Sequence, residues 1–281
     1  MKYIFLIASG ILAMAFSAAM AQQPKLAAPP KNSGKVAAKK GLPTPRMADG
    51  KVDFSGVYHA PGYGPGDPRG KSGEGFAHNI ARDLDPNDVP MLPWAKEALK
   101  QRFEVDESRF DPEGFCLPMG TPRVNPYPWK IVQSDNLLVI LYEGNVHSYR
   151  QVFMDGRAHD PSVKESYWGD SIGHWENNDT LVIDTVGLGF GDGRTNQAWL
   201  DADGHPRTNQ LHVIERFTRP ERGHLRVEVT IDDPGAYSRP WKVVQTSQLA
   251  ENWEIMENIC NENQDEKGNQ FDVLHLAGER K

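Results

Sequence analysis

The chain has 281 residues, of which 25% are charged, and a formal net charge of −7. This acidic balance disfavours a general nucleic-acid-binding protein, which needs a basic surface to contact phosphate. After residue 21 no apolar segment is long enough to predict a membrane span. The remaining length suffices for one sizeable hydrophobic core or two small ones.

The first 21 residues have the pattern of a secretory signal peptide. Lys2 precedes an apolar run over residues 3–16, and Ala19-Met20-Ala21 is a small-x-small cleavage site. An uncleaved anchor is the alternative that this pattern disfavours. Residues 22–45 are rich in Ala, Pro and Lys without a hydrophobic period, which predicts a flexible linker. We therefore expect an exported, periplasmic protein with a single domain over residues 46–281.

The amino-terminal part of this domain predicts little regular structure. Residues 53–58 have the pattern of a short strand, and residues 61–88 are crowded with Gly, Pro and Asp. Such a long irregular stretch predicts a surface loop and is a candidate lid. Pro93 begins a helix expected to reach residue 103, because Pro is favoured at the first helical position.

The stretch from residue 128 to 186 predicts consecutive antiparallel hairpins, because short turn sequences separate its apolar runs. More strands follow after a second glycine-rich loop over residues 187–204. The expected strands are residues 128–133, 137–143, 147–154, 171–175, 180–186, 211–218, 224–231, 241–249 and 253–260, with a further segment at 271–276. The fold class predicted is mainly β: an antiparallel lipocalin-like β-barrel with one or two short helices and long Gly/Pro-rich loops. A two-sheet sandwich is the alternative.

The only two cysteines are Cys116 and Cys260. In an oxidising compartment such a pair most often forms one disulfide, and two buried thiols are the rival interpretation. No C-x-x-C is present, which disfavours redox catalysis and a structural zinc knuckle.

Four charged residues lie on strand faces that otherwise suit the core: Glu143, Arg150, Asp184 and Glu215. A charge on such a face is costly unless it is paired. The four side chains therefore form either an internal salt-bridge network or a polar pocket inside the barrel, and the sequence leaves both open.

Histidines are the other candidates for acid–base chemistry, since imidazole titrates near neutral pH. We single out His147 and His212, which lie in the sequence near Glu143, Arg150 and Glu215. His212 and Glu215 are on opposite strand faces, and no H-x-H or H-E-x-x-H occurs, so no metal site is predicted.

Other reaction classes find little support in the sequence. The G-x-S-x-G around Ser171 leads into a β-hairpin rather than a strand–turn–helix elbow, which disfavours a serine nucleophile. Asp201-Ala202-Asp203-Gly204 predicts a turn, because the remaining ligands of a calcium loop do not follow. No G-x-G-x-x-G or P-loop occurs, so no nucleotide cofactor is expected.

Several segments resemble one family. Residues 45–58, with the sequence PRMADGKVDFSGVY, are similar to the "RTxDGKPDLSGVW" opening of a large group of exported proteins of soil bacteria and sphingomonads, most without an assigned activity. Val52 and Tyr58 depart from that opening. Further similar segments are residues 116–118, 155–159, 168–176, 180–185, 211–216 and 232–234. The resemblance implies a lipocalin-like barrel and assigns no catalytic residues, and its soil setting suggests plant-derived aromatic ligands.

We expect a small apolar or aromatic molecule inside the barrel, without cofactor or metal, and leave a homodimer open. Two functions compete. The first is a cofactor-independent lyase or isomerase of plant-derived phenolics, in which Arg150 holds a phenolate or carboxylate. The second is a non-catalytic periplasmic carrier or envelope binding protein. The expected catalytic residues are Glu143, His147, Arg150, His212 and Glu215, and the expected ligand-binding residues are Tyr142, Tyr149, Trp168, His174 and Asp184.

Overall fold

The computed structural model describes residues 41–60, 80–81, 84–85, 87–104, 111, 116–123, 127–144, 148–189, 199–257 and 259. All of them belong to one compact unit, residues 35–281. The signal peptide, most of the expected linker, most of the candidate lid and the segment at 271–276 lie outside the described residues.

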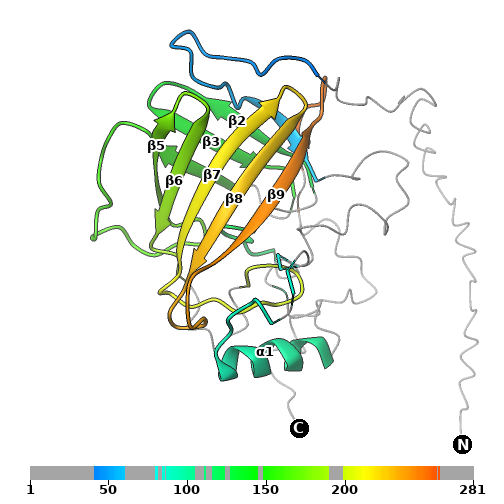
Figure 1. Cartoon of the computed structure of the whole chain (residues 1–281), viewed down its shortest axis with the longest axis vertical. Coiled ribbons are helices and arrows are strands. Elements are labelled where there is room, and N and C mark those ends of the chain that lie inside the picture. Colours follow the sequence, from blue (N-terminus) through cyan, green and yellow to red (C-terminus); the bar gives the residue numbers. More distant parts are fainter. Residues whose placement is uncertain are drawn as a thin grey trace, which may run out of the picture. The chain divides into compact units, whose positions relative to one another are not determined.

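Nine strands close into a barrel in chain order (Figure 1). They are β1 Gly56–His59, β2 Trp129–Gln133, β3 Leu137–Tyr142, β4 Ser148–Phe153, β5 Asp170–Asn177, β6 Thr180–Val186, β7 His212–Glu221, β8 His224–Asp232 and β9 Trp241–Leu249. The prediction of a mainly β barrel is confirmed, and the two-sheet sandwich is not formed. The likeness to lipocalins stays a prediction.

One junction of the barrel runs parallel. β4 and β5 pair in the same direction through Val152↔Ser171 and Phe153↔Ile172, whereas all other neighbours are antiparallel. A closed ring with an odd number of strands cannot alternate direction throughout, so one pair must be parallel. The expectation of antiparallel hairpins throughout residues 128–186 is therefore wrong here. Residues 154–169 are long enough for the crossover that a parallel pair needs.

The barrel closes between its first and last strands. β1 pairs with β9 through Tyr58↔Leu249 and His59↔Gln248. The expected final strand at 253–260 is not formed among its described residues, 253–257 and 259. The reason is that β1 already occupies the free side of β9, so a further strand has no edge to join.

The inward positions of the longer strands form the hydrophobic core. In β8, buried residues alternate with partly exposed ones, and Leu225, Val227, Val229 and Ile231 are the buried set. Burying each such side chain stabilises the fold by about 1.5–3 kcal/mol relative to leaving it exposed.

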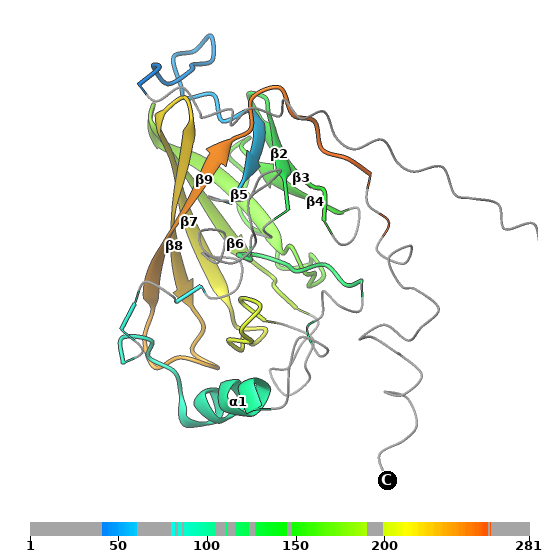
Figure 2. The same cartoon turned by 90° about the vertical axis from the view of Figure 1, so that its right-hand side faces the viewer.

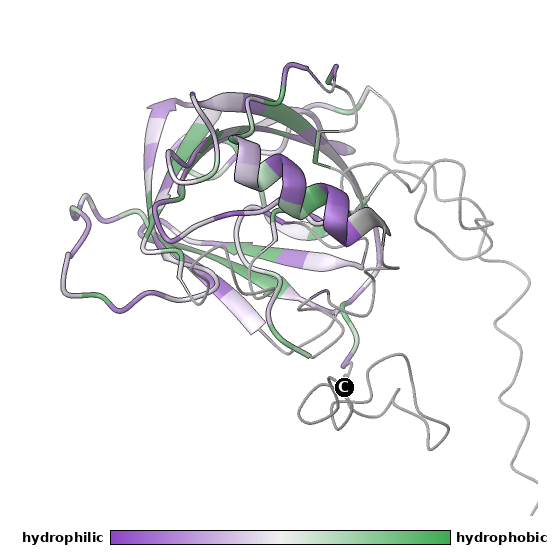
Figure 3. Ribbon diagram, turned by 90° about the horizontal axis from the view of Figure 1, so that it is seen from below, coloured by the Kyte–Doolittle hydropathy of each residue, from purple (hydrophilic) through white to green (hydrophobic). Residues whose placement is uncertain are grey.

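The expected helix is confirmed as α1, Pro93–Glu104. It lies across one end of the barrel, as seen from two sides in Figures 1 and 2 and along the barrel in Figure 3. Ala95 is fully buried, and Trp94 Nε1 donates a hydrogen bond of 2.9 Å to the carbonyl of Gly235. The guanidinium of Arg102 donates to the carbonyl of Gly204, which fixes the helix to the 199–211 loop.

The opening motif at residues 45–58 has a structural role. Arg46 pairs with Asp179 at 2.6 Å in the β5–β6 turn, and the amide of Val52 donates to the carbonyl of Asn178 at 2.9 Å. The amide of Phe54 donates to the Gln133 side chain at 2.8 Å. The motif therefore joins strand ends that are far apart in sequence.

Candidate functional site

A buried ion pair occupies the barrel interior. Arg150 of β4 and Glu215 of β7 are each 3% exposed, and Arg150 Nη2 donates to Glu215 Oε2 at 2.5 Å. Burial opposes the charge of Arg150, but the charge and hydrogen bond of Glu215 raise its pKa above the usual value. The sequence interpretation that these two charges face inward is correct for both.

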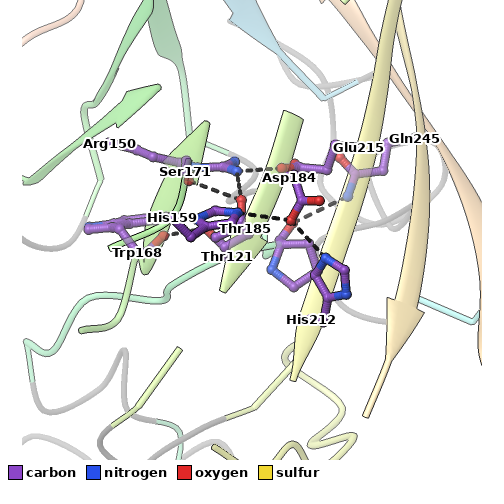
Figure 4. Close-up of polar contacts among 11 residues, drawn as sticks. Thr121, Arg150, His159, Trp168, Ser171, Asp184, Thr185, His212, Glu215 and Gln245 are labelled. Atoms are coloured by element: carbon purple, nitrogen blue, oxygen red, sulfur yellow. Dashed lines mark hydrogen bonds and ion pairs between the residues drawn. The ribbon is translucent and has the colours of Figure 1, made fainter. Parts of the chain in front are cut away.

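Two hydroxyl groups complete what we call the interior polar cluster: Arg150, Ser171, Thr185 and Glu215 (Figure 4). Arg150 Nε donates to Ser171 Oγ at 3.0 Å, and Nη2 donates to Thr185 Oγ1 at 2.7 Å. The two hydroxyl oxygens lie 2.9 Å apart. The guanidinium is thus held on several sides by β5, β6 and β7, which keeps it fixed for any group that enters.

A cavity of about 10 Å³ adjoins this cluster, enough for one water molecule. Its aromatic walls are Trp129, Tyr142, Trp168 and Phe217, and Arg150 and Glu215 supply its charges. Burial is the main cause that raises the pKa of Tyr142, so its hydroxyl is protonated at neutral pH. The site thus combines a mostly aromatic surface with a fixed cation and anion.

Trp168 covers one side of the cavity. Its ring stacks on that of Tyr142 with the centroids 4.3 Å apart and the planes within 5°. The indole Nε1 groups of Trp168 and Trp129 are buried and have no acceptor among the described residues, as is also true of Trp199 and Trp241. Two residues that line the cavity thus carry an unsatisfied N–H, whereas buried polar groups are normally hydrogen-bonded.

Residues 119–123, which we call the closing segment, lie beside Trp168. Thr121 donates through its amide to the carbonyl of Tyr167 at 3.2 Å and through Oγ1 to the carbonyl of Trp168 at 3.1 Å. Gln245 Nε2 of β9 donates to the carbonyl of Pro122 at 3.3 Å. These hydrogen bonds join the closing segment to residues 167–168 and to β9.

A second set of polar contacts lies on the outside of the barrel. His159 Nδ1 is 2.8 Å from Asp170, and His159 Nε2 is 3.2 Å from Asp184. His212 Nε2 lies 2.7 Å from the same Asp184 oxygen. All four side chains are partly exposed, so these contacts stabilise the fold by no more than about 1 kcal/mol each. Asp184 and His212 therefore do not reach the cavity.

The other expected site residues also lie elsewhere. Glu143 follows the end of β3 and accepts from the amide of Met256 at 2.9 Å rather than facing the interior. Tyr149 is 59% exposed and His174 is exposed on β5. His147 lies outside the described residues. Of the ten expected site residues, the structure brings together Arg150, Glu215, Tyr142 and Trp168.

Sequence reasoning missed several residues of the site. Gln245 is a polar residue on the inward face of β9, and Trp129 begins β2. The strict alternation in β9 was the signal that could have found Gln245. Nothing local indicated Thr121, because its position depends on a closing segment outside the strands.

Among the described residues, no three His, Cys, Asp or Glu side chains are arranged to hold a metal ion. No helix in the described ranges is long and apolar enough to cross a membrane. Cys116 is not a free thiol, but Cys260 lies outside the described residues, so their pairing stays a prediction.

Comparisons with protein-family models, with curated proteins and with solved structures return no match. The resemblance carried by the opening motif therefore stays a prediction, and the function rests on the geometry of the site.

Proposed function

We propose that the protein is a small-molecule binding protein whose ligand is an aromatic compound bearing oxygen atoms. The ligand occupies the barrel interior between Trp168 and the interior polar cluster. The observation that carries this proposal is that Trp129 and Trp168 line a cavity with aromatic walls, and that their buried indole N–H groups have no acceptor among the described residues. Phenol, methoxyl or carbonyl oxygens would accept from these donors.

Binding requires more space than the cavity in this structure provides. The cavity holds about one water, so a phenolic ring must displace Trp168 from its stack on Tyr142. A bound aromatic ring would take over that stacking contact, so the exchange costs little. The closing segment, anchored there by hydrogen bonds of Thr121 and Gln245, moves with Trp168.

The test is titration of the protein with guaiacol and vanillin, read by tryptophan fluorescence. We expect saturable quenching in the wild type. Trp168→Phe keeps an aromatic ring but removes the N–H, so it should weaken binding about tenfold, the value of one hydrogen bond. Trp253→Phe is the matched control, because Trp253 stacks on His59 away from the cavity lining. Absence of saturable quenching, or equal loss in both variants, would contradict the proposal.

Acid–base catalysis is the second candidate function. It is favoured by Glu215, a buried carboxylate on the cavity wall that could exchange a proton with a bound phenol. Against it, Glu215 is already paired with Arg150, an arrangement that suits a carrier. A lyase or isomerase would turn over phenolic substrates in the wild type and lose turnover in Glu215→Gln. Glu143→Gln serves as the control that keeps turnover, since Glu143 contacts Met256 instead.

We also propose export to the periplasm, supported by the pattern of residues 1–21. Fractionation of a bacterial host that expresses the full chain tests this. The product in the periplasmic fraction should begin at Gln22, and an intact amino terminus on a membrane-bound product would contradict the proposal.

A further inference from the structure

The outside of the barrel differs between its two halves. The outward positions of β7, β8 and β9 include charged side chains, among them Arg216, Glu228 and Lys242. On β3, by contrast, every outward position is aliphatic, and the neighbouring outward positions of β2 and β4 include exposed apolar side chains. We call this set the outer apolar face: Val132 (47% exposed), Leu137, Val139, Leu141 and Tyr149 (59% exposed).

Strand pairing joins these side chains into one patch. Leu141 of β3 lies opposite Tyr149 of β4, and Val139 of β3 lies opposite Val132 of β2. A strand with one solvated side normally alternates apolar and polar residues, whereas a strand covered on both sides is apolar throughout. β3 belongs to the second kind, which indicates that its outer side is covered as well.

The chain that leaves β9 runs onto the same side of the barrel (Figure 2). Lys130 Nζ of β2 lies 2.5 Å from a carboxylate oxygen of Glu254. Two residues further on, the amide of Met256 donates to Glu143, just after the end of β3. The side chains of Met256 and Ile259 are 70% and 41% exposed. The rest of the chain therefore starts beside the outer apolar face.

The sequence that follows has a polar part and then an apolar part. Residues 261–270, NENQDEKGNQ, contain no hydrophobic side chain, whereas four of the six residues 271–276, FDVLHL, are apolar. An extended chain from residue 259 to residue 271 can span up to about 40 Å, and a six-residue strand is only about 20 Å long. The apolar segment can therefore reach any part of the outer apolar face.

We propose that residues 271–276 of the same chain pack on the outer apolar face and cover β3 from outside. The contact is apolar on both sides, so it removes Leu141, Tyr149 and the apolar side chains of the segment from water. A tethered segment is present at a high effective concentration, which favours it over a second copy of the chain. This inference does not depend on the ligand proposed for the barrel interior.

The first experiment is photo-crosslinking of the protein with p-benzoylphenylalanine in place of Tyr149, which is exposed in the centre of the contact. We expect a crosslink within one chain to the tryptic peptide 268–280, with a yield that does not change with protein concentration. The matched control carries the same group in place of Val244, an exposed position on the outside of β9, and should not react with this peptide. A crosslink between two chains, a crosslink to another segment, or no crosslink overturns the proposal.

The second experiment removes the segment. Deletion of residues 271–281 should lower the Tm by about 2–4 °C and raise the fluorescence of added anilinonaphthalene sulfonate about twofold, because the face becomes exposed. Deletion of residues 277–281 is the control and should change neither. In Leu141→Asp, deletion of 271–281 should lower the Tm no further, and an equal fall in both backgrounds overturns the proposal. If the shortened chain does not fold, the crosslink in the full chain decides.

Discussion

At the scale of single residues, the Arg150–Glu215 pair has the largest predicted effect on stability. Arg150→Met leaves the carboxylate of Glu215 buried without its cation, so the free energy of unfolding should fall by about 3–5 kcal/mol. The double variant Arg150→Met/Glu215→Leu removes both charges and should recover most of this loss. Urea denaturation of the two variants measures both values.

The matched control is Arg226→Met, on the outer face of β8, where the side chain is 43% exposed and lies 3.9 Å from Glu228. It should change the free energy of unfolding by less than about 1 kcal/mol. If the double variant is as unstable as Arg150→Met, the loss of stability does not come from the unpaired charge of Glu215.

Asp201 makes stability depend on pH at the acid end. Burial opposes its charge, but the charge of His205 and hydrogen bonds from His205 and the amide of Ile80 lower its pKa. The folded state therefore releases this proton more readily than the unfolded state. The resulting stabilisation is present above the ordinary value of 3.8 and is lost as the pH falls through the lower folded pKa. Asp201→Asn should flatten the fall in urea midpoint below pH 4, and an unchanged slope would contradict this.

At the scale of elements, the closing segment depends on Gly120. Its φ of +77° favours glycine, and a Cβ would lie 2.5 Å from the carbonyl of Tyr167. Gly120→Ala should therefore cost about 1–3 kcal/mol and loosen the contact between the closing segment and Trp168. Gly156→Ala is the control, because Gly156 has a φ of +81° with no atom within 4 Å of the added Cβ. If both variants lose the same free energy of unfolding in urea denaturation, the clash between the added Cβ and the carbonyl of Tyr167 contributes nothing.

The elements show what the sequence could and could not predict. β7 and β8 alternate clearly, so the inward position of Glu215 could be read from the pattern. β3 is apolar at every position, so nothing in its sequence decides which face is buried. The structure turns Leu138, Ile140 and Tyr142 inward, so Glu143 lies on the opposite face, where it is buried and accepts from the amide of Met256.

Contacts between residues far apart in the chain were the other features that the sequence could not predict. The segment at 253–260 has a strand-like sequence, but whether it pairs depends on where β1 lies. Trp168 and Thr121 reach the cavity through connections whose course no local pattern specifies.

At the scale of the whole molecule, the strand junctions differ in strength. β8 pairs with both neighbours along most of its length, whereas β1 meets β9 only at Tyr58 and His59, and β4 meets β5 only at Val152 and Phe153. Native-state hydrogen exchange should therefore show amides of β8 exchanging slowest and those of β1 at least tenfold faster. Uniform protection around the ring would contradict this difference.

The odd number of strands has a consequence for where a binding site can form. Because one junction must be parallel, the chain leaving β4 has to travel back along the outside before it starts β5. That return path, residues 154–169, carries His159 past the outer surface and places Trp168 in the wall of the cavity. An even-numbered barrel could use a tight hairpin there and would have no such tether. The parity of the ring thus explains why the wall of the cavity includes a residue from a connection, Trp168, and not from strands alone.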